Sequence, residues 1–284
     1  MYYGLVTVSV ILFGIQFFFS DRYQQSQGTS LNASFMLSFL SALVSVVFMA
    51  AIHSFRIGFT PFTMMMASIA ALNGILCTLC SINALKRCNL SVYSLFSMLG
   101  GMLLPVLLSV FFYDEPFTWG KAACLVFVGG AMLLSLQGGS AKGGYGYCIA
   151  VFFLNGISAC LPKIFADAPF AKADNASYTV LLQASVLVFS GIGLLVTMKK
   201  RKKLNWKAAI FAGGGGLLNC IANFILLIAL AVLPVSVQYP FLTGGVIIVS
   251  TLIAAFTSKK PTKRDVLAVV LSFIGMLLLV LLPM

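Results

Sequence analysis

The chain has 284 residues, of which 61% are hydrophobic and only 8% are charged, and it carries a formal net charge of +12. A soluble domain has about 25% charged residues, so this composition excludes a water-soluble globular fold and indicates an integral membrane protein. The positive charge does not predict a nucleic-acid partner, because basic residues in membrane proteins gather in the loops on the cytoplasmic side.

Apolar segments follow one another along the whole chain, with short connections between them. A membrane-spanning helix needs about 20 mostly apolar residues, and these segments lack the alternation of barrel strands. The first segment lacks the basic leader and the cleavage site of a signal peptide, so we expect it to be retained. We predict ten transmembrane helices, at residues 2–20, 33–53, 62–85, 90–112, 118–137, 144–163, 175–198, 206–232, 235–256 and 264–282.

The two halves of the chain, residues 1–142 and 143–284, repeat one another. The tripeptide Asn-Ala-Ser opens the second apolar segment at residues 32–34 and the seventh at 175–177. We interpret it as a duplicated helix cap rather than as a glycosylation site. Each half holds five helices, an odd number, so the second half enters the membrane from the opposite side. We therefore predict an all-α integral membrane fold of ten transmembrane helices in two inverted five-helix repeats.

Further matches between the halves recur at spacings of 142 to 146 residues. Matches of glycine, proline and asparagine carry more weight than matches of leucine, which arise by chance in apolar helices. The pairs are Gly4 with Gly146, Gly14 with Gly156, Asn73 with Asn219, Gly100 with Gly245, and Pro116 with Pro261.

Lysine and arginine residues are divided unequally between the loops. Fourteen of the 18 follow the odd-numbered segments, mainly in the clusters at 199–203 and 259–264, and four follow the even-numbered segments. Because positively charged loops remain in the cytoplasm, we expect both termini of the chain to be extracytoplasmic, in a bacterial plasma membrane.

Residues 83–134 hold a pattern of Ala-Leu before a short turn, a proline inside a small-residue helix, an acid after that helix and two glycines in the next. These features are Ala84-Leu85, Pro105, Glu115 and Gly129-Gly130. Together with ten segments in two repeats, the pattern resembles the EamA-type branch of the drug/metabolite transporter superfamily. The second half matches it weakly, because Ser250 and Lys260 stand in place of the proline and the acid.

That resemblance implies a secondary transporter, not an enzyme, that moves a small polar or amphiphilic metabolite by alternating access. It also implies cytoplasmic termini, whereas the count of basic residues favours extracytoplasmic ones, which we adopt. Two alternatives stay open. A flippase for lipids or lipid-linked sugars would need a basic group for phosphate, for which Lys163 is the candidate. A membrane enzyme would need a buried acid, base or metal cluster.

Neutral polar side chains within the segments are the candidates for contact with the solute. Each of them could instead hydrogen-bond a neighbouring helix, a contact worth about 0.6 kcal/mol. Together they fall on the first, third, fourth, sixth, eighth and ninth segments, which line the central cavity in the resembled fold. We predict substrate binding by Gln16, Asn73, Tyr93, Ser94, Ser97, Asn155, Ser158, Asn219, Asn223, Gln238 and Tyr239.

Tyr93-Ser94 and Gln238-Tyr239 stand at equivalent positions of the two halves. Because the predicted halves are inverted, we expect these pairs to approach the transport path from opposite mouths. Pro240 leaves the carbonyl of Ser236 without its helical partner, as in the interrupted helices that border many binding sites.

All six acidic residues lie at or beyond the ends of the segments, at Asp21, Asp114, Glu115, Asp167, Asp174 and Asp265. This placement argues against ion coupling through a buried carboxylate. Cys77 and Cys80 have no second ligand pair, and no phosphate-binding GxxxxGKS/T motif occurs, so we expect no metal, cofactor or catalytic residue. The expected partners are a small-molecule solute and the lipid bilayer, not nucleic acid. A coupling ion and a homodimer stay open.

Overall fold

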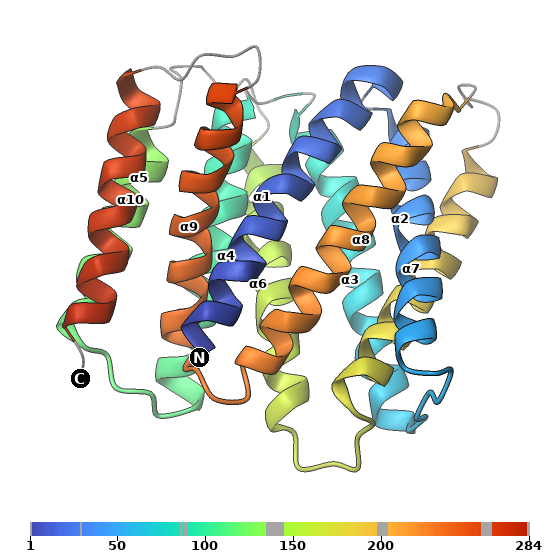
Figure 1. Cartoon of the computed structure of the whole chain (residues 1–284), viewed down its shortest axis with the longest axis horizontal. Coiled ribbons are helices and arrows are strands. Elements are labelled where there is room, and N and C mark those ends of the chain that lie inside the picture. Colours follow the sequence, from blue (N-terminus) through green and yellow to red (C-terminus); the bar gives the residue numbers. More distant parts are fainter. Residues whose placement is uncertain are drawn as a thin grey trace.

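The computed structural model describes residues 2–28, 30–85, 87, 90–134, 145–197, 204–256 and 263–282. Within these residues the chain is helical apart from short connections, and consecutive helices run in opposite directions through one bundle (Figure 1). The helices are α1 (Tyr2–Gln27), α2 (Leu31–Ile52), α3 (Pro61–Leu85), α4 (Leu90–Phe112), α5 (Trp119–Leu134), α6 (Tyr145–Asp167), α7 (Asn175–Val196), α8 (Trp206–Ala229), α9 (Val235–Phe256) and α10 (Lys263–Leu281).

Over the described residues, seven of these helices, namely α1, α2, α3, α6, α7, α8 and α9, are long and apolar enough to cross a membrane. The other three hold shorter apolar stretches, at Phe96–Phe112, Trp119–Ala131 and Val266–Leu279. Large apolar side chains such as Phe111 and Val196 are exposed, as expected of residues that lipid covers. Over the described residues, the prediction of an all-helical, multi-pass membrane protein is confirmed.

Helices α2 and α7 begin at caps that differ from the predicted ones. The hydroxyl of Ser30 accepts the N–H of Ala33 at 3.2 Å at the start of α2. The carboxylate of Asp174 accepts the N–H groups of Ala176 and Ser177 at the start of α7. The prediction that the Asn-Ala-Ser asparagines cap these helices is therefore wrong. An oxygen upstream of each tripeptide does so, and a carboxylate also suits the positive end of the helix dipole.

Both ends of α2 are fastened to α7, which runs antiparallel to it. Asn32 donates from Nδ2 to the hydroxyl of Thr197 at 2.9 Å, at the C-terminal end of α7. His53 caps the C-terminus of α2, and its Nε2 lies 3.4 Å from Oδ2 of Asp174. These contacts fix α2 against α7, and both helices contribute to the site described below.

Close packing between helices depends on glycines. Helix α1 packs along α8 and α9, and α6 packs along α3 and α4. A Cβ on Gly14 of α1 would lie 2.3 Å from Val249 of α9, and a Cβ on Gly156 of α6 would lie 2.7 Å from Leu104 of α4. Only glycine lets these helices approach each other so closely.

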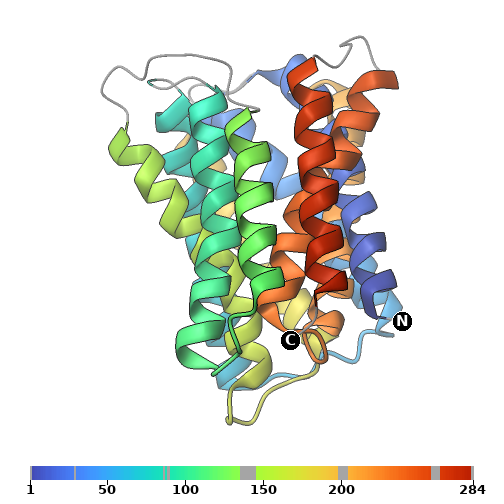
Figure 2. The same cartoon turned by 90° about the vertical axis from the view of Figure 1, so that its left-hand side faces the viewer.

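Helix α1 begins and helix α10 ends at the same end of the bundle, here called the terminal face (Figures 1 and 2). The connections between α2 and α3, α4 and α5, α6 and α7, and α8 and α9 lie at this face as well. The chain passes from α1 to α2 at the opposite face. The basic clusters at 199–203 and 259–260 fall outside the described residues.

Candidate functional site

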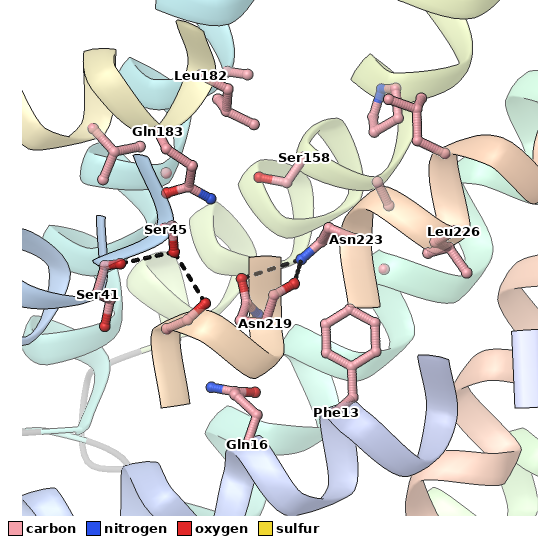
Figure 3. Close-up of a pocket in the computed structure, with 18 of the residues that line it drawn as sticks. Phe13, Gln16, Ser41, Ser45, Ser158, Leu182, Gln183, Asn219, Asn223 and Leu226 are labelled. Atoms are coloured by element: carbon pink, nitrogen blue, oxygen red, sulfur yellow. Dashed lines mark hydrogen bonds between the residues drawn. The ribbon is translucent and has the colours of Figure 1, made fainter. Parts of the chain in front are cut away.

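A cavity of about 610 Å³ lies in the middle of the bundle, between helices α1 to α4 and α6 to α9 (Figure 3). Its volume falls in the range of about 300–1,000 Å³ that is typical of small-molecule sites. Helices α5 and α10 contribute none of the described residues that line it. They pack against each other and against α9 at one side of the bundle.

Uncharged polar side chains make up much of the cavity wall. The described residues that line the cavity include no aspartate, glutamate, lysine, arginine or histidine. Apolar and aromatic side chains, among them Phe13, Phe17 and Leu182, complete the wall. The polar lining residues are Gln16, Ser20, Ser38, Ser41, Ser45, Asn155, Ser158, Tyr178, Thr179, Gln183, Asn219, Asn223, Tyr239 and Thr243.

Carboxamides of α1 and α8 lie together at the cavity (Figure 3). Asn219 and Asn223 stand one turn apart on α8. Nδ2 of Asn223 donates to the backbone carbonyl of Asn219 at 2.8 Å and to its Oδ1 at 3.1 Å. Nε2 of Gln16 donates to the hydroxyl of Ser20 at 3.0 Å. These contacts orient three carboxamides at the wall.

Small residues join α2 to α8 along another part of the wall. The hydroxyl of Ser41 donates to the carbonyl of Ala212 at 2.9 Å. The hydroxyl of Ser45 lies 2.7 Å from the carbonyl of Ser41 and 3.1 Å from that of Gly216 (Figure 3). A Cβ on Gly216 would lie 2.4 Å from Cα of Ser41, so glycine permits the approach that makes these bonds.

Helix α6 is tied to α3 and α4 by asparagines. Nδ2 of Asn73 on α3 donates to the hydroxyl of Ser158 at 2.7 Å and to the carbonyl of Leu154 at 2.8 Å. Nδ2 of Asn155 donates to the carbonyl of Ser97 on α4 at 2.6 Å. Buried amides bonded between helices rigidify a membrane bundle, so these contacts hold Asn155 and Ser158 at the cavity.

Toward the terminal face the cavity ends at a buried aromatic cluster. Tyr178 stacks on Phe165 with ring centroids 4.1 Å apart. Tyr239 donates its hydroxyl to the carbonyl of Ala159 on α6. These rings pack with Leu230 in one buried cluster that also includes residues of α3 and α6. The cluster closes the cavity at this end.

The structure places six of the predicted substrate residues at the cavity, which are Gln16, Asn155, Ser158, Asn219, Asn223 and Tyr239. Asn73 and Ser97 lie behind the wall and bond to lining residues. Gln238 is only 1% exposed, and its Nε2 donates to the carbonyl of Leu226 at 2.9 Å. Successive residues of a helix point about 100° apart, so Gln238 turns toward α8 while Tyr239 reaches the cavity. The side chains of Tyr93 and Ser94 fall outside the described residues.

Sequence reasoning missed the contribution of α2 and α7 to the wall. We expected six other segments to line the cavity, whereas Ser38, Ser41 and Ser45 of α2 and Thr179 and Gln183 of α7 also line it. A glutamine inside an apolar segment is the same signal that selected Gln16. Serines and threonines are a weaker signal, since they also occur in lipid-facing helices, where the hydroxyl bonds to the preceding turn.

No protein-family model matches this chain, and no curated protein matches it by sequence. The fold is nevertheless shared with solved structures. One of them, described only as "Crystal structure of protein", is 17% identical in sequence, and the two match with a TM-score of 0.72 over 98% of this chain and 96% of that one. At this identity the likeness shows a common fold and does not extend to function.

Proposed function

We propose that the protein is a secondary transporter that moves a small polar or amphiphilic metabolite across the membrane by alternating access. The observation that carries this proposal is the central cavity, which is lined by both halves of the chain and by uncharged hydrogen-bonding groups. Transporters built from inverted repeats bind their solute near the middle of the membrane, at the interface of the repeats. The family resemblance of the sequence agrees with this proposal and stays a prediction.

Mirrored contacts support the inverted repeat. Gly14 of α1 packs against Val249 of α9, and Gly156 of α6 packs against Leu104 of α4. The two glycines correspond at a spacing of 142 residues, and their two partners correspond at a spacing of 145. The same contact therefore occurs twice. The first helix of the first half packs on α9 of the second half, and the first helix of the second half packs on α4 of the first half.

A second pair of contacts follows the same rule. A Cβ on Gly100 would lie 2.0 Å from the carbonyl oxygen of Phe152, and a Cβ on Gly245 would lie 2.8 Å from the side chain of Val10. Gly100 and Gly245 correspond at a spacing of 145, and Val10 and Phe152 at a spacing of 142. Two halves with equivalent packing can exchange conformations at little cost in free energy, which is what alternating access requires.

The cavity is closed toward the terminal face by the cluster of Tyr178, Leu230 and Tyr239. The count of basic residues in the sequence predicts that this face lies outside the cell. We therefore infer a conformation that is closed to the outside, with solute exchange at the cytoplasmic face.

The flippase alternative gains no support from Lys163. Its Nζ lies 2.9 Å from Oδ2 of Asp167 and 5.2 Å from the centroid of the Tyr113 ring. Lys163 is not among the described residues that line the cavity, so this lysine does not supply the basic group that a phosphate would need there.

Cysteine accessibility tests alternating access. In a variant without native cysteines, Leu230→Cys and Ser38→Cys would be treated with a membrane-impermeant thiol reagent in vesicles of each orientation. Two exposed positions serve as controls: Lys172→Cys should react from the terminal face, and Gln24→Cys should react from the opposite face. Because Leu230 also lines the cavity, we expect Leu230→Cys to react from both faces and Ser38→Cys to react from the opposite face. Failure of Leu230→Cys to react from the terminal face would contradict the proposal.

A further inference from the structure

Five carboxamides line the cavity, and each carries both donors and an acceptor. Gln16, Asn155, Gln183, Asn219 and Asn223 come from four helices, α1, α6, α7 and α8. Figure 3 shows Gln183 and Gln16 on opposite sides of a space that also borders Asn219 and Asn223. Each carboxamide offers two N–H donors beside one carbonyl acceptor and carries no charge.

Several of these groups keep unused hydrogen-bonding capacity. Gln183 makes no hydrogen bond to any residue that the structure describes. Gln16 and Asn155 use their amide nitrogens on Ser20 and on a backbone carbonyl, and their side-chain carbonyls accept no hydrogen bond from the described residues. Asn219 accepts from Asn223 and keeps its own Nδ2 as a donor. A solute in the cavity therefore meets both donors and acceptors.

The lining favours an uncharged solute over a charged one. An ion taken out of water is stabilised only where an opposite charge or several oriented dipoles replace its hydration. None of the described lining residues carries a charge, and the six acids of the chain lie at or beyond the ends of the predicted segments. A neutral solute loses far less hydration free energy on entering this cavity.

Aromatic rings give the cavity flat surfaces. Phe13 stands beside Asn223 (Figure 3), and Phe17, Tyr178 and Tyr239 also line the wall. Aromatic side chains pack best against another planar group. A carboxamide pairs well with a planar edge that presents an N–H beside an acceptor, as asparagine and glutamine do with the edge of adenine.

We propose that the cavity binds an uncharged planar solute with an N–H donor next to a carbonyl or ring-nitrogen acceptor, the chemistry of a nucleobase or nucleoside. This inference rests on the proposed transport function and names its substrate class. Gln183 makes the principal contact, because neither end of its carboxamide bonds to a described residue, and Asn219 adds a donor from α8.

The test is equilibrium binding of uridine and adenosine to the purified protein. Three further solutes serve as comparisons. Uridine monophosphate and adenosine monophosphate supply the same bases with negative charge, and mannitol is an uncharged polyol without a planar ring. We expect the two nucleosides to bind and the other three solutes to bind at least tenfold more weakly. Gln183→Ala and Asn219→Ala should each weaken nucleoside binding about tenfold, the effect of one lost hydrogen bond.

Matched variants control for folding. Gln24→Ala and Asn83→Ala remove the same side chains outside the cavity and should leave binding unchanged. Gln183→Met keeps the length of the glutamine side chain but removes its donors and its acceptor, and it should weaken nucleoside binding about tenfold without lowering the unfolding temperature of the free protein. Binding unaffected by Gln183→Ala, or equal binding of mannitol or the monophosphates, would overturn the inference.

The inference and the proposed function fail in different ways. Nucleoside binding without exchange across proteoliposomes would contradict transport and leave the binding site intact. Exchange of mannitol without nucleoside binding would overturn the substrate class and leave transport intact.

Discussion

Glu115 caps helix α9 at Ser236, because its carboxylate accepts the Ser236 backbone N–H at 3.3 Å and the Ser236 hydroxyl. The N–H of Val235 donates to the same carboxylate at 3.2 Å, and Nζ of Lys121 lies 3.9 Å away. Glu115 follows α4 in the first half of the chain, and α9 belongs to the second. The contact joins the halves at the terminal face, and Val235 belongs to the cluster that closes the cavity there.

This contact predicts that Glu115 stabilises the closed terminal face. Glu115→Ala leaves two N–H groups and a hydroxyl without their acceptor, which should cost about 1–3 kcal/mol of unfolding free energy. Glu115→Gln keeps an acceptor and should cost less. The cysteine of Leu230→Cys should also react faster with the thiol reagent when combined with Glu115→Ala.

Asp114→Asn is the matched control for Glu115→Gln. Asp114 is exposed and has a positive φ of 51°, a conformation that asparagine tolerates. An equal loss of stability from Asp114→Asn would show that the loop, and not the cap, matters.

The mirrored glycines predict paired effects of substitution. Gly14→Ala and Gly156→Ala each place a methyl group less than 3 Å from the side chain of the facing helix. Such overpacking should lower the unfolding free energy by about 1–3 kcal/mol. The measurement is thermal unfolding in detergent, and Val249→Ala should restore part of the stability lost in Gly14→Ala.

Gly4 and Gly146 supply the control, because they are also paired by the predicted repeat but have no described neighbour within 4 Å of an added Cβ. Alanine at these positions should be neutral or stabilising by up to about 1 kcal/mol, since glycine is a poor helix former. Equal destabilisation at all four glycines would contradict the packing argument.

Asp174 predicts a pH dependence of stability at the acid end. Burial raises the pKa of its carboxyl group. The hydrogen bonds from the hydroxyl and N–H of Ser177, the attraction to His53 and the N–H of Ala176 together bring the pKa below its ordinary value. A depressed folded-state pKa adds stability above the unfolded pKa of about 3.9, and this stability is lost as the pH falls through the folded pKa.

The unfolding temperature should therefore fall below about pH 4, and this fall should be smaller in Asp174→Asn. Ser177→Ala removes a hydrogen bond to the carboxylate and raises its folded pKa toward the unfolded one, so the fall should be smaller and should end at a higher pH. In an Asp174→Asn background, Ser177→Ala should not change the pH dependence of the unfolding temperature. A change in that background would show that a group other than Asp174 causes the pH dependence.

The distribution of lysine and arginine predicts that both termini are extracytoplasmic. A C-terminal alkaline phosphatase fusion should be active, and a C-terminal green fluorescent protein fusion should be dark. The opposite result would reverse the orientation and would also assign the closed terminal face to the cytoplasm.

The hydrophobicity of the chain alone determined that it is an all-helical membrane protein and located its helices. Hydrophobicity over about 20 residues is a local property, so these predictions need no knowledge of neighbours. The first helix still extends to Gln27, beyond the predicted end at residue 20, because polar residues continue a helix without crossing the membrane. The predicted repeat also paired Gly14 with Gly156 from the sequence alone, without knowledge of the residues they pack against.

Only the tertiary structure decided which polar side chains share the cavity. Gln238 and Tyr239 are adjacent in sequence, yet one is buried against α8 and the other reaches the cavity, because consecutive residues face different neighbours around a helix. Gln183 has the same sequence signal as Gln16, but its role depends on α7 packing beside α2. The site is formed by contacts between helices far apart in the chain, and no local pattern in the sequence specifies those contacts.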